Sequence, residues 1–379
     1  MNARAPQQSA GSIVERVIRD DVRAMHAYAV PDARGFVKLD AMENPYALPT
    51  ELREELGRRL ANVAINRYPA PRAEALRTTL RRVMQVPDGC DVMLGNGSDE
   101  LIALACAAVA RDGASVLSLV PGFVMFELSA RVARLEYVAV PLKPDFEIDR
   151  DATIAAMRAH RPALAFIAYP NNPTGNLFAR ADVEAIVIAA RETDTLVIVD
   201  EAYRAFASDS FMDALPHHDH LLVLRTVSKS GLAGARLGYL AGAPQWLNEF
   251  DKIRPPYNIN VFTQCAVQFA LEHCDVLDAQ AAILRGERAG LFGALKAIDG
   301  ITPFPSDANF ILFRVESPNA MAAAEIFEAL KRRRVLVKDL SRMHPLCANA
   351  LRVTVSTLEE NAIFLDALSA ALHETQPTR

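Results

Sequence analysis

The chain lacks the features that mark secreted, membrane-spanning and nucleic-acid-binding proteins. It has five cysteines in 379 residues, an odd number without a C-x-x-C pair, which favours a reduced, cytoplasmic compartment. Its longest apolar run, Leu101–Ala110, is about half of the roughly 20 residues that a membrane span needs. Arg4, Arg16 and Arg19 stand where a signal peptide would have its apolar core. The formal net charge is -5 and no long basic block occurs, so we expect neither nucleic acid nor a membrane as a main partner.

Patterns that bind metals or nucleotides are also missing. The run His217-His218-Asp219-His220 has no helical i, i+4 histidine pair and lies in a polar stretch before an apolar run, so we interpret it as a loop. No Gly-Lys-Ser or Gly-Lys-Thr occurs, which excludes a Walker-type phosphate loop. We therefore expect no metal site.

The chain does have a regular alternation of short apolar runs and longer helical patterns. With 51% hydrophobic residues it can form a sizeable core. Because the runs are apolar on both faces, they are typical of strands covered by helices on both sides. We predict an α/β fold with a mostly parallel sheet of about seven strands. The predicted strands are Asp91–Leu94, Ser115–Leu119, Glu136–Pro141, Leu164–Ala168, Leu196–Val199, Leu221–Arg225 and Gly238–Ala241.

A second, smaller α/β region follows. Two prolines, Pro255-Pro256, interrupt the pattern and predict a boundary there. The predicted organisation is an N-terminal arm (1–46) that packs with the small domain or a partner subunit, a large domain (47–256) and a small C-terminal domain (257–379). In the last part we predict a helical stretch at Val261–Ile298, strands at Phe310–Val315, Val335–Leu340 and Leu351–Val355, and helices at Asn319–Lys331 and Glu359–His373.

Polar residues follow several predicted strands, at the sheet edge where ligands of open α/β proteins bind. The stretch Gly95–Glu100 can hold an anion at a helix start, or can be a plain turn and cap. The loop Tyr169–Gly175 combines two prolines with Asn171 and Asn172, whose amides can bond a ligand or close a tight turn. Asp200 ends a buried strand and needs a cationic partner there, unless it caps the next helix.

Lys229 is one of seven lysines and lies in Ser228-Lys229-Ser230-Gly231, just after a predicted strand. An amine held among small polar residues at a strand end can form a Schiff base; a solvated surface lysine is the alternative. Ser228 and Arg236 can bind a phosphate, the arginine through a charge-assisted fork. Together these motifs supply the parts that are needed to hold pyridoxal phosphate.

Asn171-Asn172-Pro173-Thr174-Gly175, Asp200-Glu201-Ala202-Tyr203 and Ser228-Lys229 with Arg236 resemble the motifs of fold-type I pyridoxal-phosphate aminotransferases. The resemblance spans roughly residues 40–360. Within this family the chain most resembles the histidinol-phosphate aminotransferases. The segments that carry this resemblance are Val37–Tyr46, Asn66–Pro69 and Leu351–Ser356. It implies a homodimer with shared active sites that moves an amino group from a small-molecule donor to a 2-oxo acid, with histidinol phosphate and 2-oxoglutarate as the expected pair in histidine biosynthesis.

The resemblance also implies roles for the matching residues. Lys229 would bind the cofactor and then move the proton, Asp200 would pair with the pyridine nitrogen, and Phe123 would stack on the ring. Asn172 and Tyr203 would bond the phenolic oxygen. The residues expected around the cofactor phosphate are Gly97, Ser98, Asp99, Ser228, Arg236 and, from the partner subunit, Tyr68. The expected substrate-binding residues are Arg352, Lys338, Tyr28 and Asn44.

Three positions depart from the family's usual residues. Tyr is frequent where Phe123 stands, Arg where Lys338 stands and Gly where Ser356 stands. Lys338 keeps a charge but loses a bidentate fork, and a solvated strand-end lysine is its alternative interpretation. An aromatic amino-acid aminotransferase and a phospho-amino-acid decarboxylase of the same fold are therefore alternatives. A regulatory protein that keeps the fold without catalysis is a third, although we see no segment for a DNA-binding module.

Overall fold

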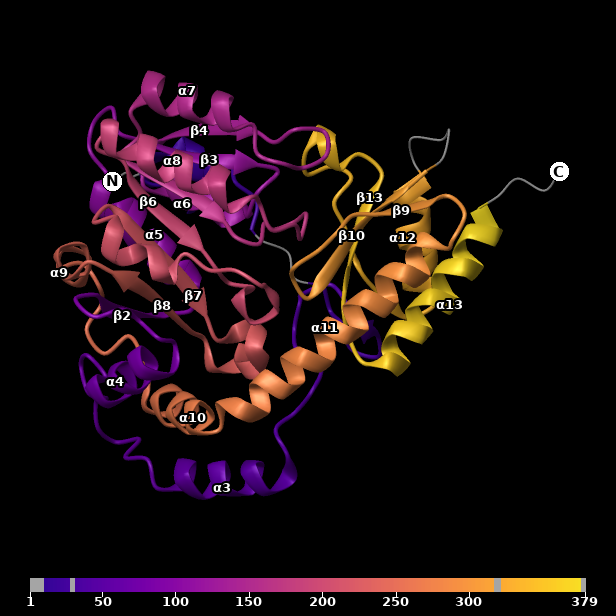
Figure 1. The fold of residues 1–379 in the computed structure, drawn as a ribbon, viewed down its shortest axis with the longest axis horizontal. Helices are drawn as coiled ribbons and strands as arrows, with labels where there is room; N and C mark the ends of the chain where they lie inside the picture. Colours follow the sequence, from indigo (N-terminus) through magenta and orange to yellow (C-terminus); the bar gives the residue numbers. More distant parts are fainter. Residues whose placement is uncertain (1–9, 28–30, 317–321, 376–379) are drawn as a thin grey trace, which may run out of the picture. The chain divides into compact units, whose positions relative to one another are not determined.

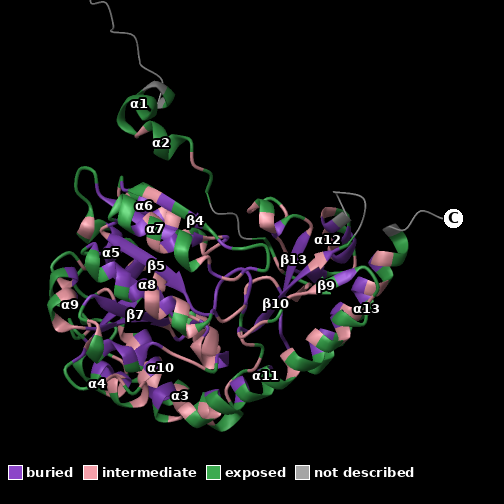
Figure 2. Ribbon diagram, turned by 45° about the horizontal axis from the view of Figure 1, so that its top comes forward, coloured by how far each residue is buried: buried purple, intermediate pink, exposed green. Residues whose placement is uncertain are grey.

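The structure is a computed structural model that describes residues 10–27, 31–316 and 322–375. It divides into two compact units, Met1–Arg34 and Gly35–Arg379. In the described part of the first unit the chain forms two short helices, α1 (Ala10–Val17) and α2 (Asp20–Arg23). Both helices are mostly exposed (Figure 2). All further elements, and the cavity that Lys229 lines, belong to the second unit.

The second unit contains a seven-stranded sheet in the order β2-β8-β7-β6-β5-β3-β4 (Figure 1). Five strands, β3 to β7, run parallel, whereas β8 is antiparallel to both β2 and β7. The mostly parallel sheet predicted from the sequence is therefore confirmed. Its strands are β2 (Asp91–Asn96), β3 (Ser115–Val120), β4 (Glu136–Pro141), β5 (Leu164–Ala168), β6 (Leu196–Asp200), β7 (Leu221–Thr226) and β8 (Leu237–Gly242).

Helices cover both faces of this sheet. Within β7, Leu222 and Leu224 belong to one hydrophobic cluster, while Leu221 and Val223 belong to another, as the two-residue period of a strand requires. The first cluster takes in α5 (Ser98–Val109), α6 (Val124–Val132) and α9 (Pro244–Asp251). The second takes in α4 (Glu74–Val83), α7 (Arg150–His160), α8 (Arg180–Glu192) and α10 (Val261–Glu272).

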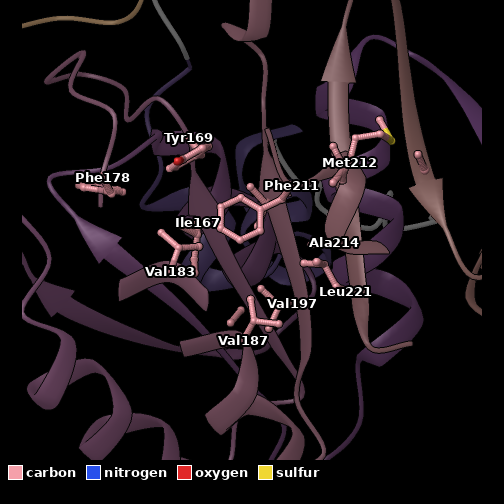
Figure 3. Close-up of a cluster of buried hydrophobic side chains, with 14 of the residues drawn as sticks. Ile167, Tyr169, Phe178, Val183, Val187, Val197, Phe211, Met212, Ala214 and Leu221 are labelled. Atoms are coloured by element: carbon pink, nitrogen blue, oxygen red, sulfur yellow. The ribbon is translucent and has the colours of Figure 1, made fainter. Parts of the chain in front are cut away.

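Figure 3 shows part of the second cluster. Val183 and Val187 of α8 lie against Ile167 of β5 and Val197 of β6, and the ring of Phe211 lies close to them. All of these side chains are almost fully buried. Burying such side chains contributes roughly 1.5–3 kcal/mol each, so both faces of the sheet are held firmly.

A smaller sheet follows the long helix α11 (Cys274–Lys296), which Figure 1 shows running from α10 toward β10. Its four strands are antiparallel and lie in the order β12-β13-β10-β9. A separate parallel pair joins β1 (Val37–Lys38) to β11 (Val335–Leu336). The remaining elements of this region are β9 (Ile301–Pro303), β10 (Phe310–Val315), β12 (Lys338–Asp339), β13 (Ala350–Thr354), α12 (Ala322–Arg332) and α13 (Leu358–Thr375).

Two predicted elements are broken where the sequence suggested continuity. The stretch Val261–Ile298 forms α10 and α11, which are separated at His273, where φ is -121° and ψ is 38°. The stretch Val335–Leu340 forms β11 and β12, because its two halves pair with different strands, β1 and β13. The start of the predicted helix at Asn319–Lys331 lies outside the described residues.

The helix α3 (Thr50–Ala61) packs against α10.

All five cysteines are free thiols. Within the three described ranges, no helix is long and apolar enough to cross a bilayer. The same ranges contain no group of three His, Cys, Asp or Glu side chains that could hold a metal ion.

Candidate active site

The carboxyl ends of β5, β6 and β7 meet the start of α5 around one cavity of the second unit. This is the edge at which parallel strands of an open sheet deliver polar side chains to a ligand. Most of the residues that line it were predicted from the sequence. The lining consists of Met42, Ser98, Asp99, Phe123, Ala168, Pro170, Asn172, Asp200, Ala202, Tyr203, Thr226, Ser228, Lys229 and Arg236.

Lys229 follows β7 and points its amine at the chain segment before α3. Its Nζ donates a hydrogen bond to the carbonyl oxygen of Ala41 at 3.1 Å and lies 5.9 Å from the ring centre of Tyr203. Burial, and next the positive charge of Arg352, lower the pKa of Lys229 to about 8. A larger share of this amine is therefore neutral near pH 7 than for an exposed lysine. Only the neutral amine has the lone pair that attacks a carbonyl carbon or accepts a proton.

Asp200 is the last residue of β6 and is only 4% exposed. Its Oδ1 accepts a hydrogen bond from the Ala202 N–H at 3.0 Å, and it forms no ion pair within the described part of the chain. Burial raises the pKa of Asp200 to about 7, with a further contribution from the negative charge of Asp99. A buried acid of this kind is stabilised by a cation placed in the cavity.

The start of α5 and Arg236 form a cradle for an anion. Gly97 precedes the helix with φ +82°, a conformation that favours glycine, and a Cβ there would come within 2.7 Å of Arg236 Nη2. Arg236 also lies 3.7 Å from the Asp99 carboxylate. Ser228 accepts a hydrogen bond from the Thr226 hydroxyl at 2.9 Å. The free N–H groups of the α5 start and the guanidinium together suit a phosphate.

A chain of hydrogen bonds links the cavity to the smaller sheet. Asn172 Nδ2 donates to the Tyr203 hydroxyl at 3.1 Å, and Arg352 Nη1 donates to Asn172 Oδ1 at 2.6 Å. Arg352 Nη2 also donates to the Asp40 carbonyl at 3.2 Å. Arg352 belongs to β13 and is 7% exposed. The guanidinium is thus fixed at the border of the cavity that Phe123 and Asn172 line.

The other predicted residues lie outside the lining of the cavity. Lys338 of β12 is paired directly with Arg352 in the register of the smaller sheet. Asn44 Nδ2 donates to Gln280 Oε1 at 3.0 Å, so its amide is used within the fold. Tyr68 is 82% exposed and stacks on Tyr257, with ring centres 4.7 Å apart. Tyr28 lies outside the described residues.

The segment before α3 contributes residues that the motif analysis missed. Met42 lines the cavity and has a φ of 54°, which is unusual for a side chain of its size. Its N–H donates to the Thr354 hydroxyl and its carbonyl accepts from Asn309, both at 3.0 Å. These bonds hold the carbonyl groups of Ala41 and Asp40 toward Lys229 and Arg352. The sequence offered only the resemblance of Val37–Tyr46 as a signal, since methionine does not predict a positive φ.

Comparison with known families decides the class of the protein. The profile of the family described as aminotransferase class I and II matches residues 34–368. The chain belongs to this family. It is accordingly an enzyme that uses pyridoxal phosphate, and the fold-type I architecture expected from the motifs is confirmed.

Curated relatives cover almost the whole chain. It is 60% identical over 378 residues to "Histidinol-phosphate aminotransferase 1" of Ralstonia nicotianae, covering 99% of this chain and 100% of the relative. It is 59% identical over 365 residues to "Histidinol-phosphate aminotransferase 2" of Cupriavidus pinatubonensis, covering 96% and 98%. The motif-based resemblance to this group is thereby confirmed.

Solved structures agree on the fold. The histidinol-phosphate aminotransferase of Sinorhizobium meliloti, solved in complex with pyridoxal-5'-phosphate, superposes with a TM-score of 0.85 at 22% identity, over 95% of this chain and 98% of that one. The L-threonine-O-3-phosphate decarboxylase of Porphyromonas gingivalis superposes with a TM-score of 0.74 at 22% identity, over 89% and 99%. Because these identities are low, the superpositions establish the fold alone.

The residues of the cavity fit pyridoxal phosphate. The buried Asp200 carboxyl has a place for a cation, which the ring nitrogen provides once protonated. The cradle of Gly97 and Arg236 suits the phosphate, and the amine of Lys229 suits the aldehyde. Each group of the cofactor thus has a chemically matched side chain in the same cavity.

Proposed function

We propose that this enzyme transfers an amino group between histidinol phosphate and 2-oxoglutarate in histidine biosynthesis. The observation that carries the substrate assignment is the position of Lys338 directly opposite Arg352 on the neighbouring strand, with Arg352 bonded to Asn172 of the cavity lining. A substrate with a phosphate group needs cationic side chains at this end of the site. Relatives of about the same length that are named for this activity support the same substrate.

The chemistry follows from the groups around the cofactor. When bound, pyridoxal phosphate supplies an electron sink for the charge that develops at the substrate carbon. Asp200 holds the proton on the ring nitrogen, since a carboxylate stabilises the cation that it faces. Lys229, with its lowered pKa, moves the proton at the substrate carbon as a general base and acid. Asn172 and Tyr203, which are hydrogen-bonded to each other, would bond the phenolic oxygen, and Phe123 of the cavity lining would pack on the ring.

The start of α5 and Arg236 would hold the phosphate of the cofactor. Ser98 and Asp99 offer backbone N–H groups at the start of α5, and Arg236 reaches the same point past Gly97. Ser228 adds its hydroxyl. On the substrate side, Arg352 binds the carboxylate of the amino-acid partner or the phosphate of histidinol phosphate, and Lys338 contributes charge for that phosphate. Tyr28, which lies outside the described residues, is a further candidate for that phosphate. Asn44, whose amide bonds Gln280, is a further candidate for substrate binding.

The active unit that we propose is a homodimer. Tyr68 does not line the cavity of its own chain and is 82% exposed, which supports a role at the partner's phosphate site. The division into an N-terminal arm to residue 46, a large domain to residue 256 and a small domain beyond it is part of the same proposal. A cytoplasmic location is supported by the five free thiols.

Steady-state kinetics test the substrate directly. We expect kcat/KM for histidinol phosphate to exceed that for phenylalanine by at least about 10²-fold, because only the first substrate uses Lys338 and Arg352 together. The acceptor should be 2-oxoglutarate in both assays. A clear preference for phenylalanine would overturn the substrate assignment and leave an aromatic amino-acid aminotransferase.

A further inference from the structure

A buried ion pair between Glu201 and Arg225 lies next to the catalytic acid, Asp200, but does not line the cavity. Glu201 follows Asp200 directly, and its side chain has no exposed surface. Arg225 lies at the end of β7, and its Nη2 is 2.8 Å from Glu201 Oε2. Its Nε donates to the same oxygen at 2.9 Å. Burying two charges costs desolvation free energy, and apolar side chains of similar volume are often at least as stabilising. The stability of the fold alone therefore does not explain this ion pair.

The pair connects the strand ends that carry the site. The Glu201 N–H donates to the Leu224 carbonyl at 2.7 Å, which extends the ladder between β6 and β7. Arg225 Nη1 reaches the hydroxyl of Tyr239 on β8 at 3.4 Å. Asp200 stands one residue before Glu201, and Lys229 stands four residues after Arg225. The ion pair therefore spans the two strands that present the acid and the amine.

The loop beyond β6 is attached to the same pair. Ser210 Oγ donates to Glu201 Oε2 at 2.9 Å, and the Phe211 N–H donates to Glu201 Oε1 at 2.5 Å. Arg225 Nη2 donates to Ser210 Oγ at 2.8 Å. Phe211 in turn packs in the hydrophobic cluster on that face of the sheet (Figure 3). All of the oxygens of Glu201 and the fork of Arg225 are used, so the position of the pair is determined from several sides.

We propose that Glu201 and Arg225 are positioning residues that fix the Asp200 carboxyl relative to the Lys229 amine. The inference rests on the proposed aminotransferase function, in which these two groups act on opposite ends of one rigid cofactor ring. The separation between them must match the ring, and a misplacement of about 1 Å can cost roughly 10²-fold in rate. Hydrogen bonds between strand ends alone leave the last residues of a strand free to shift, whereas the buried fork joins β6, β7 and β8.

The test uses the loaded enzyme with Glu201→Gln, which keeps the shape of the side chain and removes its charge. We expect kcat to fall about 10²-fold while KM changes by no more than about twofold, because substrate binding depends on Arg352. The visible circular dichroism of the bound cofactor, which reports its orientation, should weaken. The dissociation constant of the cofactor from the apoprotein should rise about 10-fold. Arg225→Lys keeps the charge but loses the fork, and should show the same changes to a smaller extent.

Asp209→Asn is the matched control. Asp209 lies on the same loop, accepts from the Tyr169 hydroxyl at 2.8 Å and pairs with Arg180. Within the described residues, its side chain bonds Tyr169, Arg180 and the Ser210 N–H, none of which belongs to β6 or β7. We expect this variant to lose thermal stability while its dichroism and kcat stay at wild-type values. If Asp209→Asn reproduces the losses of Glu201→Gln, the loop alone matters and the proposal is wrong. Wild-type dichroism and kcat in Glu201→Gln would also overturn it.

A double variant covers the case in which an unpaired Arg225 prevents folding. Glu201→Met combined with Arg225→Met replaces the pair by apolar side chains of similar volume, an exchange that other proteins tolerate. A folded double variant that has lost kcat and dichroism supports the proposal, whereas one with full kcat contradicts it. The dichroism and the cofactor affinity need no substrate, and kcat is measured with the donor that the wild type prefers. A failure of histidinol phosphate as substrate is therefore distinguishable from a failure of this inference.

Discussion

The two sheets of the second unit hold their parts of the site in different ways. The larger sheet presents Asp200 and Lys229 at the ends of parallel strands that are buried on both faces. The smaller sheet presents Arg352 and Lys338 from short antiparallel strands, and Lys338 stands in a strand of only two residues. Arg352 is linked to the cavity lining by a side-chain bond to Asn172. We propose that the larger sheet fixes the chemistry and that the smaller sheet selects the substrate.

Removal of the Lys229 amine is the strongest test of the role of the larger sheet. Lys229→Ala should lower transamination by roughly 10⁴-fold, because Lys229 is the only lysine among the described residues that line the cavity. The visible absorbance of the bound cofactor should disappear in the same variant. Lys252→Ala, at an exposed lysine that pairs with Glu249, is the control and should behave as wild type. Near-normal turnover in Lys229→Ala would exclude the proposed mechanism.

Removing the acid should have the next largest effect. Asp200→Asn keeps the size of the side chain but loses the charge that holds the ring nitrogen protonated. We expect kcat to fall about 10²- to 10³-fold for every amino donor while the cofactor still binds. The measurement is kcat with both histidinol phosphate and phenylalanine. If kcat is unchanged, Asp200 serves only to bond the Ala202 N–H.

Changes on the smaller sheet should act on substrate binding instead. Arg352→Lys keeps the charge but loses the fork that bonds Asn172 and the substrate anion. We expect kcat/KM to fall about 10²-fold, equivalent to about 2.7 kcal/mol, with most of the change in KM. A fall in kcat with an unaltered KM would mean that the smaller sheet also takes part in the chemistry.

Lys338→Met tests whether the smaller sheet recognises the phosphate group of the substrate. Phenylalanine, which has no phosphate, serves as the comparison substrate. We expect kcat/KM for histidinol phosphate to fall about 10-fold, or about 1.4 kcal/mol, while the value for phenylalanine changes little. Equal losses for the two substrates would indicate that Lys338 only supports the strand. Lys296→Met, at the end of α11, serves as the control.

The smallest expected effect concerns pH. The pKa of Lys229 is lowered to about 8 from 10.5, so the neutral, reactive amine becomes the major form above about pH 8. The rate at which apoprotein captures pyridoxal phosphate should therefore rise with pH and level off above about 8. Stopped-flow absorbance at constant ionic strength measures this rate. A midpoint near 10.5 would show that burial does not affect the amine.

The sequence predicted the larger sheet better than the smaller one, for a physical reason. Strands that are buried on both faces are continuous apolar runs, so all seven were found to within about two residues. In the C-terminal region, β11 and β12 come from one continuous run in the sequence, Val335–Leu340, and only their different partners, β1 and β13, separate them. The positive φ of Met42 and the buried pair of Glu201 and Arg225 depend on tertiary contacts that no local pattern records.

The most direct test of the central claim follows the cofactor through half of the reaction. Loaded enzyme is mixed with histidinol phosphate in the absence of any acceptor, and the visible absorbance of the cofactor is recorded. We expect the band to bleach with one equivalent of substrate per subunit and to return when 2-oxoglutarate is added. A band that histidinol phosphate leaves unchanged, while phenylalanine bleaches it, would contradict the proposed function.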